Sequence, residues 1–125
     1  MNKNEKIQPR SYSFALSIVK FCRFLEDNKV DRVIIKQLLR AGTSIGANVE
    51  EAYGTPAGKD FINKMHIALK EARETNYWLR IINDTELISS NDLSEILAES
   101  EEIKNILAQI IITAKKRLEN LQKQS

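Results

Sequence analysis

Apolar residues recur in this chain at alternating steps of three and four over almost its whole length. The clearest run lies between positions 56 and 84, where the steps follow one another without interruption. Its members are Phe61, Met65, Ala68, Ala72, Thr75, Leu79 and Ile82. This period places about one side chain per turn on a single face of an α-helix. The pattern therefore predicts a long amphipathic helix.

Three more segments, at about 11–27, 31–53 and 91–121, carry the same period. Only four glycines and two prolines divide the 125 residues, too few for the turns of a β-sandwich, a barrel or a Rossmann unit. Short connections force consecutive helices to be antiparallel. The sequence therefore predicts an all-α, antiparallel up-down-up-down four-helix bundle as a single domain over residues 1–125. We expect residues 1–10 to form a flexible arm, and Thr55-Pro56 to begin the third helix.

The last predicted helix has more apolar surface than one bundle interior requires. Its main stripe ends with Ile110, Ala114, Leu118 and Leu121. Further isoleucines lie outside that stripe, at Ile96, Ile106, Ile111 and Ile112. Because contiguous exposed apolar surface marks association sites, we expect the chain to form a homo-oligomer through these isoleucines. The alternative is that a wide arc of the helix faces the core.

The charge of the chain is nearly balanced, at +2, which is not typical of a dedicated nucleic-acid-binding protein. Its basic residues are concentrated in the first forty positions, whereas residues 81–125 hold five basic against eight acidic residues. The candidates for contact with nucleic acid are Lys20, Arg23, Arg32 and Lys36. The alternative is a solvated helical face whose long side chains also cover apolar surface.

Residues that carry catalytic or metal chemistry are sparse. His66 is the only histidine and Cys22 the only cysteine, so multi-histidine zinc sites and an internal disulfide framework are excluded. Glu71 and Glu74 without a third acid would bind a metal weakly. We expect no catalytic residue, no metal and no cofactor, and we do not expect an enzyme. No apolar run approaches the length of a membrane span, so we expect a cytoplasmic protein that does not contact membranes.

A polar stripe accompanies the apolar stripe of the second predicted helix. Together with a similar stripe on the third, it defines a predicted structural cluster: Arg40, Ser44, Asn48, Glu51, Glu71, Glu74 and Trp78. We expect Arg40 to pair with Glu71 or Glu74, Asn48 to satisfy nearby polar groups, and the Trp78 indole to donate a hydrogen bond within the cluster. Gly42 and Gly46, one turn apart in a helix interior, indicate that another backbone packs closely there.

Two of these segments also carry a family resemblance. They are Gln37 to Ala52 (QLLRAGTSIGANVEEA) and Asp60 to Arg80 (DFINKMHIALKEARETNYWLR). Both closely resemble the four-helix-bundle proteins of the 23S ribosomal RNA intervening-sequence family. The resemblance implies a bacterial, cytoplasmic bundle that assembles as a ring-like homopentamer. It further implies a distant likeness to the pentameric accessory protein of diversity-generating retroelements, which engages nucleic acid through a basic surface.

These observations lead to a functional expectation. We expect a non-enzymatic, self-associating bundle that acts as a scaffold for nucleic acid or a ribonucleoprotein. In a ring, modest basic surfaces on each subunit would act together through avidity. The alternative is a protein–protein interaction module that does not bind nucleic acid.

Overall fold

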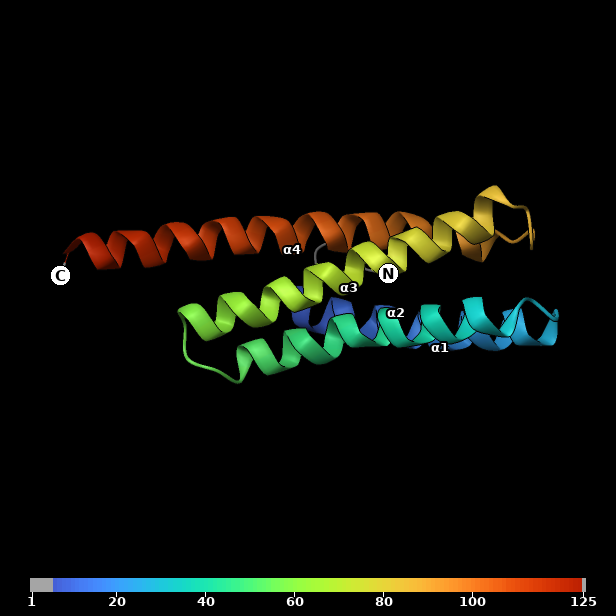
Figure 1. Ribbon diagram of the computed structural model, residues 1–125, viewed down its shortest axis with the longest axis horizontal. Coiled ribbons are helices and arrows are strands. Elements are labelled where there is room, and N and C mark those ends of the chain that lie inside the picture. The colour runs from blue at the N-terminus through green and yellow to red at the C-terminus, as the bar shows by residue number, and fades with distance from the viewer. Residues whose placement is uncertain (1–5, 125) are drawn as a thin grey trace.

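The computed structural model describes residues 6–124 and contains four α-helices that run antiparallel to their neighbours (Figure 1). They are α1 (Ile7–Asp27), α2 (Arg32–Tyr53), α3 (Lys59–Asp84) and α4 (Asn91–Gln124). Consecutive helices pack against each other, and α4 also packs against α1, which closes the bundle. The predicted all-α four-helix bundle is confirmed. No helix within residues 6–124 is both long and apolar enough to cross a bilayer.

The first helix begins earlier than the sequence indicated. The predicted arm covered residues 1–10, but positions 7–10 form the first turn of α1, where Ile7 and Arg10 are buried. The arm prediction is therefore wrong for these residues, and positions 1–5 lie outside the described range. Pro9 lies within this first turn. Proline is tolerated in the first turn because the backbone N–H groups there have no helical partner.

The corner between α2 and α3 also differs from the prediction. The Thr55 hydroxyl donates to the carbonyl of Ala52 at 2.8 Å, so this residue closes α2 instead of capping the next helix. The third helix begins at Lys59, not at Pro56. Gly58 separates the two, with φ at +125°, a conformation that only glycine adopts without strain. The backbone break at Gly58 thus sets the start of α3.

The core consists of the predicted stripes. Phe14, Ile18, Leu38, Met65 and Leu79 are fully buried, each with no measurable exposure. Burial of such side chains, at roughly 1.5–3 kcal/mol each, is the main source of stability. No strand or sheet occurs in residues 6–124.

Helices α1 and α2 approach closely at the two glycines. A Cβ atom on Gly46 would lie 3.2 Å from the backbone oxygen of Ser11, which confirms the predicted close backbone. A Cβ atom on Gly42 would lie only 2.8 Å from two side-chain carbons of Ile18. Glycine at these positions lets α1 and α2 approach more closely than larger residues would permit.

Helix α4 is much longer than α1. Its 34 residues extend about 50 Å, whereas the 21 residues of α1 extend about 30 Å. Figure 1 shows α1 starting well inside the length of α4, whose C-terminal turns project past the rest of the bundle. We call residues 110–124 the overhang.

Candidate functional site

The predicted polar cluster forms between α2 and α3. Arg40 Nη1 donates to Glu71 Oε2 at 3.1 Å, and Arg40 Nη2 pairs with Glu74. The Trp78 indole N–H donates to Glu74 Oε2 at 3.2 Å. The predicted pairing of Arg40 and the predicted role of the indole are therefore confirmed. The side chain of Arg40 is 46% exposed, so this is a surface network worth at most about 1 kcal/mol per pair.

Three other predicted members lie outside this network of charges. Ser44 Oγ donates to the Arg40 carbonyl at 2.6 Å, and Asn48 Nδ2 donates to the Ser44 carbonyl at 2.8 Å. Both therefore bond to their own helix. Glu51 pairs instead with Lys64 at 3.1 Å, near the other end of α2. Their inclusion in one cluster was wrong, because helical spacing places residues on one face without bringing their side chains together.

The pair Glu71 and Glu74 does not resemble a metal centre. Both carboxylates are engaged by Arg40, whose positive charge opposes that of a cation. Within residues 6–124 no three His, Cys, Asp or Glu side chains converge in a metal-binding group. The cluster fixes how α2 and α3 meet and offers no chemistry beyond that.

A second ion cluster, absent from the sequence predictions, lies inside the bundle. Arg10 donates from Nε and Nη2 to the two oxygens of Glu99, both at 2.6 Å, and Nη2 also pairs with Glu102. Arg10 is 3% exposed and Glu99 6%. The hydrogen bonds to Glu99 raise the pKa of the guanidinium, which therefore stays charged. This bidentate pair joins α1 to α4.

Cys22 is buried beside α2 at 4% exposure. Burial raises the pKa of its thiol to about 11, so the reactive thiolate is scarce near neutral pH. Cys22 therefore acts as a small buried hydrophobic residue in this core.

The four candidate nucleic-acid residues are all exposed and come from two helices. Lys20 and Arg23 lie on α1, and Arg32 and Lys36 on α2. Lys20 lines a hollow together with Asp92 and Glu95 of α4. These two carboxylates reduce the positive potential that a phosphate would meet at Lys20.

The isoleucines expected at an oligomer contact are divided between core and surface. Ile96 and Ile111 are 6% and 4% exposed and belong to the core, so their assignment to an oligomer contact is wrong. Ile106 packs against the core while partly buried, and Ile112 is 47% exposed. The arc of α4 that faces α1 and α3 is wider than a two-in-seven stripe, which accounts for the buried members.

The accessible apolar surface of α4 lies mainly on the overhang. A groove of about 500 Å³ runs between α4 and the corner that joins α2 to α3. Its lining residues are Tyr53, Ala57, Gly58, Phe61, Gln109, Ile110, Thr113, Ala114, Arg117, Leu118 and Leu121. Four of these, Ile110, Ala114, Leu118 and Leu121, are the final members of the predicted core stripe. They stay accessible because α1 starts at Ile7 and does not reach them.

Known proteins share this fold and these sequence motifs. The sequence model of the family described as 23S rRNA-intervening sequence protein matches residues 3–109. A crystal structure of a protein with unknown function from the S23 ribosomal protein family of Bacteroides thetaiotaomicron is 44% identical, with a TM-score of 0.79. That alignment covers 85% of this chain and 98% of the other. No protein with a curated description matches the sequence. The chain belongs to the 23S rRNA-intervening sequence protein family.

Proposed function

We propose that this protein is a non-enzymatic, self-associating helical bundle that serves as a scaffold for nucleic acid. The observation that carries self-association is the groove at the overhang. There, the stripe that forms the core elsewhere continues without a covering helix, and Leu121 is 64% exposed. Contact of this stripe with water is unfavourable. Covering it with another protein surface would favour association by roughly 25 cal/mol per Å² of apolar area buried.

The occupant of the groove is a second copy of the same chain. The outer surface of α1 and α2 carries exposed apolar side chains, among them Tyr12, Leu16 and Leu39. A groove on one part of the subunit and an apolar patch on another make a head-to-tail contact, and such contacts generate rings when the rotation closes. A ring of five follows from the family resemblance. The groove is a feature of this chain, and most of its lining lies beyond residue 109, where the family match ends.

Light scattering coupled to size exclusion tests the assembly. The wild-type chain is expected at a multiple of 14.3 kDa, and the double variant Leu118→Glu/Leu121→Glu at the mass of a single chain. Its helical circular dichroism should be retained, because Leu121 is mostly exposed and Leu118 is not fully buried.

A control is Ile67→Glu, which places one such charge at an exposed apolar site of α3 outside the groove. It is expected to keep the wild-type mass. A wild-type mass of 14.3 kDa at every concentration would end the proposal of self-association.

The scaffold role for nucleic acid is supported by family membership and by cationic side chains at the surface. The alternative, a protein-interaction module, is supported by the same apolar groove. A gel-shift series over salt separates the two. Binding to RNA or DNA that weakens steeply with salt supports the scaffold. If the protein shifts neither RNA nor DNA at low salt, the protein-interaction module is the function that stands.

A further inference from the structure

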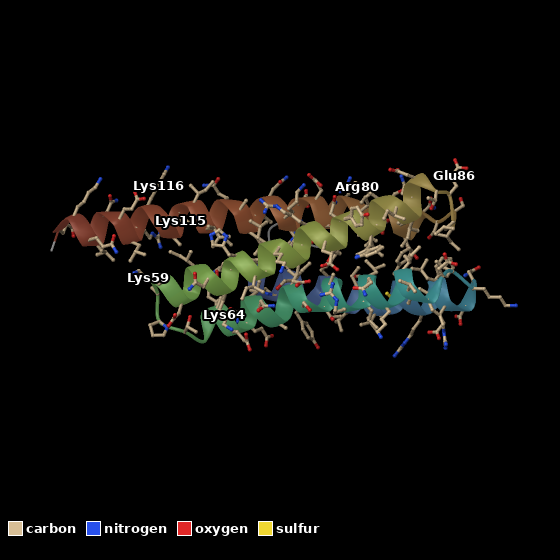
Figure 2. All side chains as sticks on the ribbon, in the orientation of Figure 1. Lys59, Lys64, Arg80, Glu86, Lys115 and Lys116 are labelled. Carbon is tan, nitrogen blue, oxygen red and sulfur yellow. The ribbon has the colours of Figure 1, made fainter. Side chains whose placement is uncertain are left out.

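A polar groove between α3 and α4 brings three cationic side chains together. It has a volume of about 370 Å³ and is separate from the groove at the overhang. Its lining residues are Leu69, Arg73, Asn76, Arg80, Lys104, Asn105 and Ala108. Figure 2 labels Arg80 where α3 runs alongside α4. This site has no signature in the sequence, because its charges come from two helices and neither contributes a basic run.

The charges of α3 are sorted between its two sides. Glu71 and Glu74 face α2, where they pair with Arg40. Arg73 and Arg80 instead line the groove beside α4. In the described part of the chain, neither arginine forms a salt bridge with a carboxylate. The acids that would neutralise these arginines are thus used on the opposite side of the helix.

Asn76 organises the base of the groove. It is 5% exposed and donates from Nδ2 to Glu101 Oε2 at 3.2 Å and to Ser100 Oγ at 3.4 Å. Its Oδ1 accepts a hydrogen bond from Arg80 Nε at 2.9 Å. This bond fixes the guanidinium by one edge and leaves its two terminal nitrogens for a ligand. Positioning by a buried side chain distinguishes Arg80 from a freely moving surface arginine.

One carboxylate, Glu101, reaches this region and pairs with Lys104 at 2.8 Å. With Arg73, Arg80 and Lys104 against Glu101, the groove keeps an excess of positive charge. Arginine and asparagine donors suit anionic ligands with several oxygens, above all phosphates.

An aromatic ring stands next to these donors. Tyr77 is 49% exposed, and the Arg80 guanidinium lies 5.9 Å from its ring centroid. An exposed ring beside a cationic groove is the arrangement on which unpaired bases stack while the backbone contacts the cations. Bases of a duplex are already stacked and would not use it.

We propose that the groove between α3 and α4 binds the phosphodiester backbone of single-stranded nucleic acid, with Arg73, Arg80 and Lys104 as the cationic contacts and Tyr77 as a stacking platform. This inference rests on the proposed scaffold function and names its binding site. The sequence-based candidates are instead Lys20, Arg23, Arg32 and Lys36. The two assignments predict that different variants lose binding.

The test measures fluorescence anisotropy of a labelled oligouridylate against salt concentration, with the assembled full-length protein. The variant Arg73→Gln/Arg80→Gln is expected to bind at least tenfold more weakly at about 50 mM salt. Loss of two phosphate contacts should also reduce the slope of log Kd against log salt by about 1.4. Thermal unfolding and light scattering on the same sample establish that fold and assembly are intact, and single substitutions replace the double variant if it fails to fold.

The matched control is Arg32→Gln/Lys36→Gln, which removes the same charge from exposed positions outside the groove. It should bind like the wild type. If this control loses binding while the Arg73/Arg80 variant keeps it, the groove assignment is wrong and the scaffold function stands. If the wild type itself does not bind at low salt, the scaffold function fails as well.

Tyr77→Ala tests the preference for single strands. It should weaken oligouridylate binding several-fold and leave binding of a duplex of equal charge unchanged. Equal affinity for heparin and oligouridylate, with no effect of Tyr77→Ala, would overturn the assignment to nucleic acid and indicate a general polyanion site.

Discussion

At the scale of single residues, Arg10 and Glu99 show how a buried charge is tolerated in this bundle. Both are almost fully enclosed, and both guanidinium bonds to Glu99 are short. Removal of water from two ions is costly, and their mutual attraction offsets most of that cost only while both are present. The pair therefore specifies how α1 meets α4 more than it adds net stability.

Two variants separate these contributions. Glu99→Leu removes the buried carboxylate that Arg10 binds and keeps the more exposed Glu102, and we expect a loss of about 3 kcal/mol in the free energy of unfolding. The double variant Arg10→Met/Glu99→Leu removes both charges and should lie within about 1 kcal/mol of the wild type. Urea denaturation at one fixed protein concentration measures both. A double variant as unstable as the single would show that the ion pair itself stabilises the fold.

At the scale of the helices, close packing between α1 and α2 depends on Gly42. Alanine would gain about 1 kcal/mol in helix propensity, but its Cβ would lie 2.8 Å from two carbons of the fully buried Ile18. Overpacking of this kind costs about 1–3 kcal/mol. We expect Gly42→Ala to lower the free energy of unfolding by about 1 kcal/mol, and the melting temperature by about 4 °C.

Gly54→Ala is the matched control, since its Cβ would lie at an ordinary 3.4 Å from the nearest atom and φ is −87°. It should be neutral or slightly stabilising. If Gly42→Ala proved as harmless as this control, helix α1 would be free to move away from α2.

The helices could be predicted from local spacing, and the Arg40 pair from polar stripes on two helices that are consecutive in the chain. A stripe at steps of three and four fixes a helix face, and residues on facing stripes come within reach. The first residues of α1 and α3 were less predictable, because Pro9 and Gly58 affect the start of a helix through backbone geometry and not through residue spacing. The Arg10–Glu99 pair joins positions 89 residues apart, and no local pattern reports such a contact.

At the scale of the whole molecule, the net charge of a long segment does not show how the charged residues are distributed along α4. Residues 81–125 have a net charge of −3. Within them, however, the acids Asp92, Glu95, Glu99, Glu101 and Glu102 precede all five basic residues, and Lys115, Lys116 and Arg117 lie together on the overhang. A net charge taken over these forty-five residues does not show such a division. The overhang is therefore both basic and apolar.

The length of α4 has a consequence for how fast its backbone amides exchange with solvent. An isolated helical end of a few turns is only marginally stable in water, so amides of residues 112–124 should exchange rapidly in a dilute sample of separate chains. If a neighbouring copy covers the groove, the same amides become protected as concentration rises, while those around Leu38 and Leu79 exchange slowly throughout. Hydrogen–deuterium exchange followed by mass spectrometry across a dilution series records this difference. If the amides of residues 112–124 are equally protected at every concentration, the C-terminal turns are stable within a single subunit.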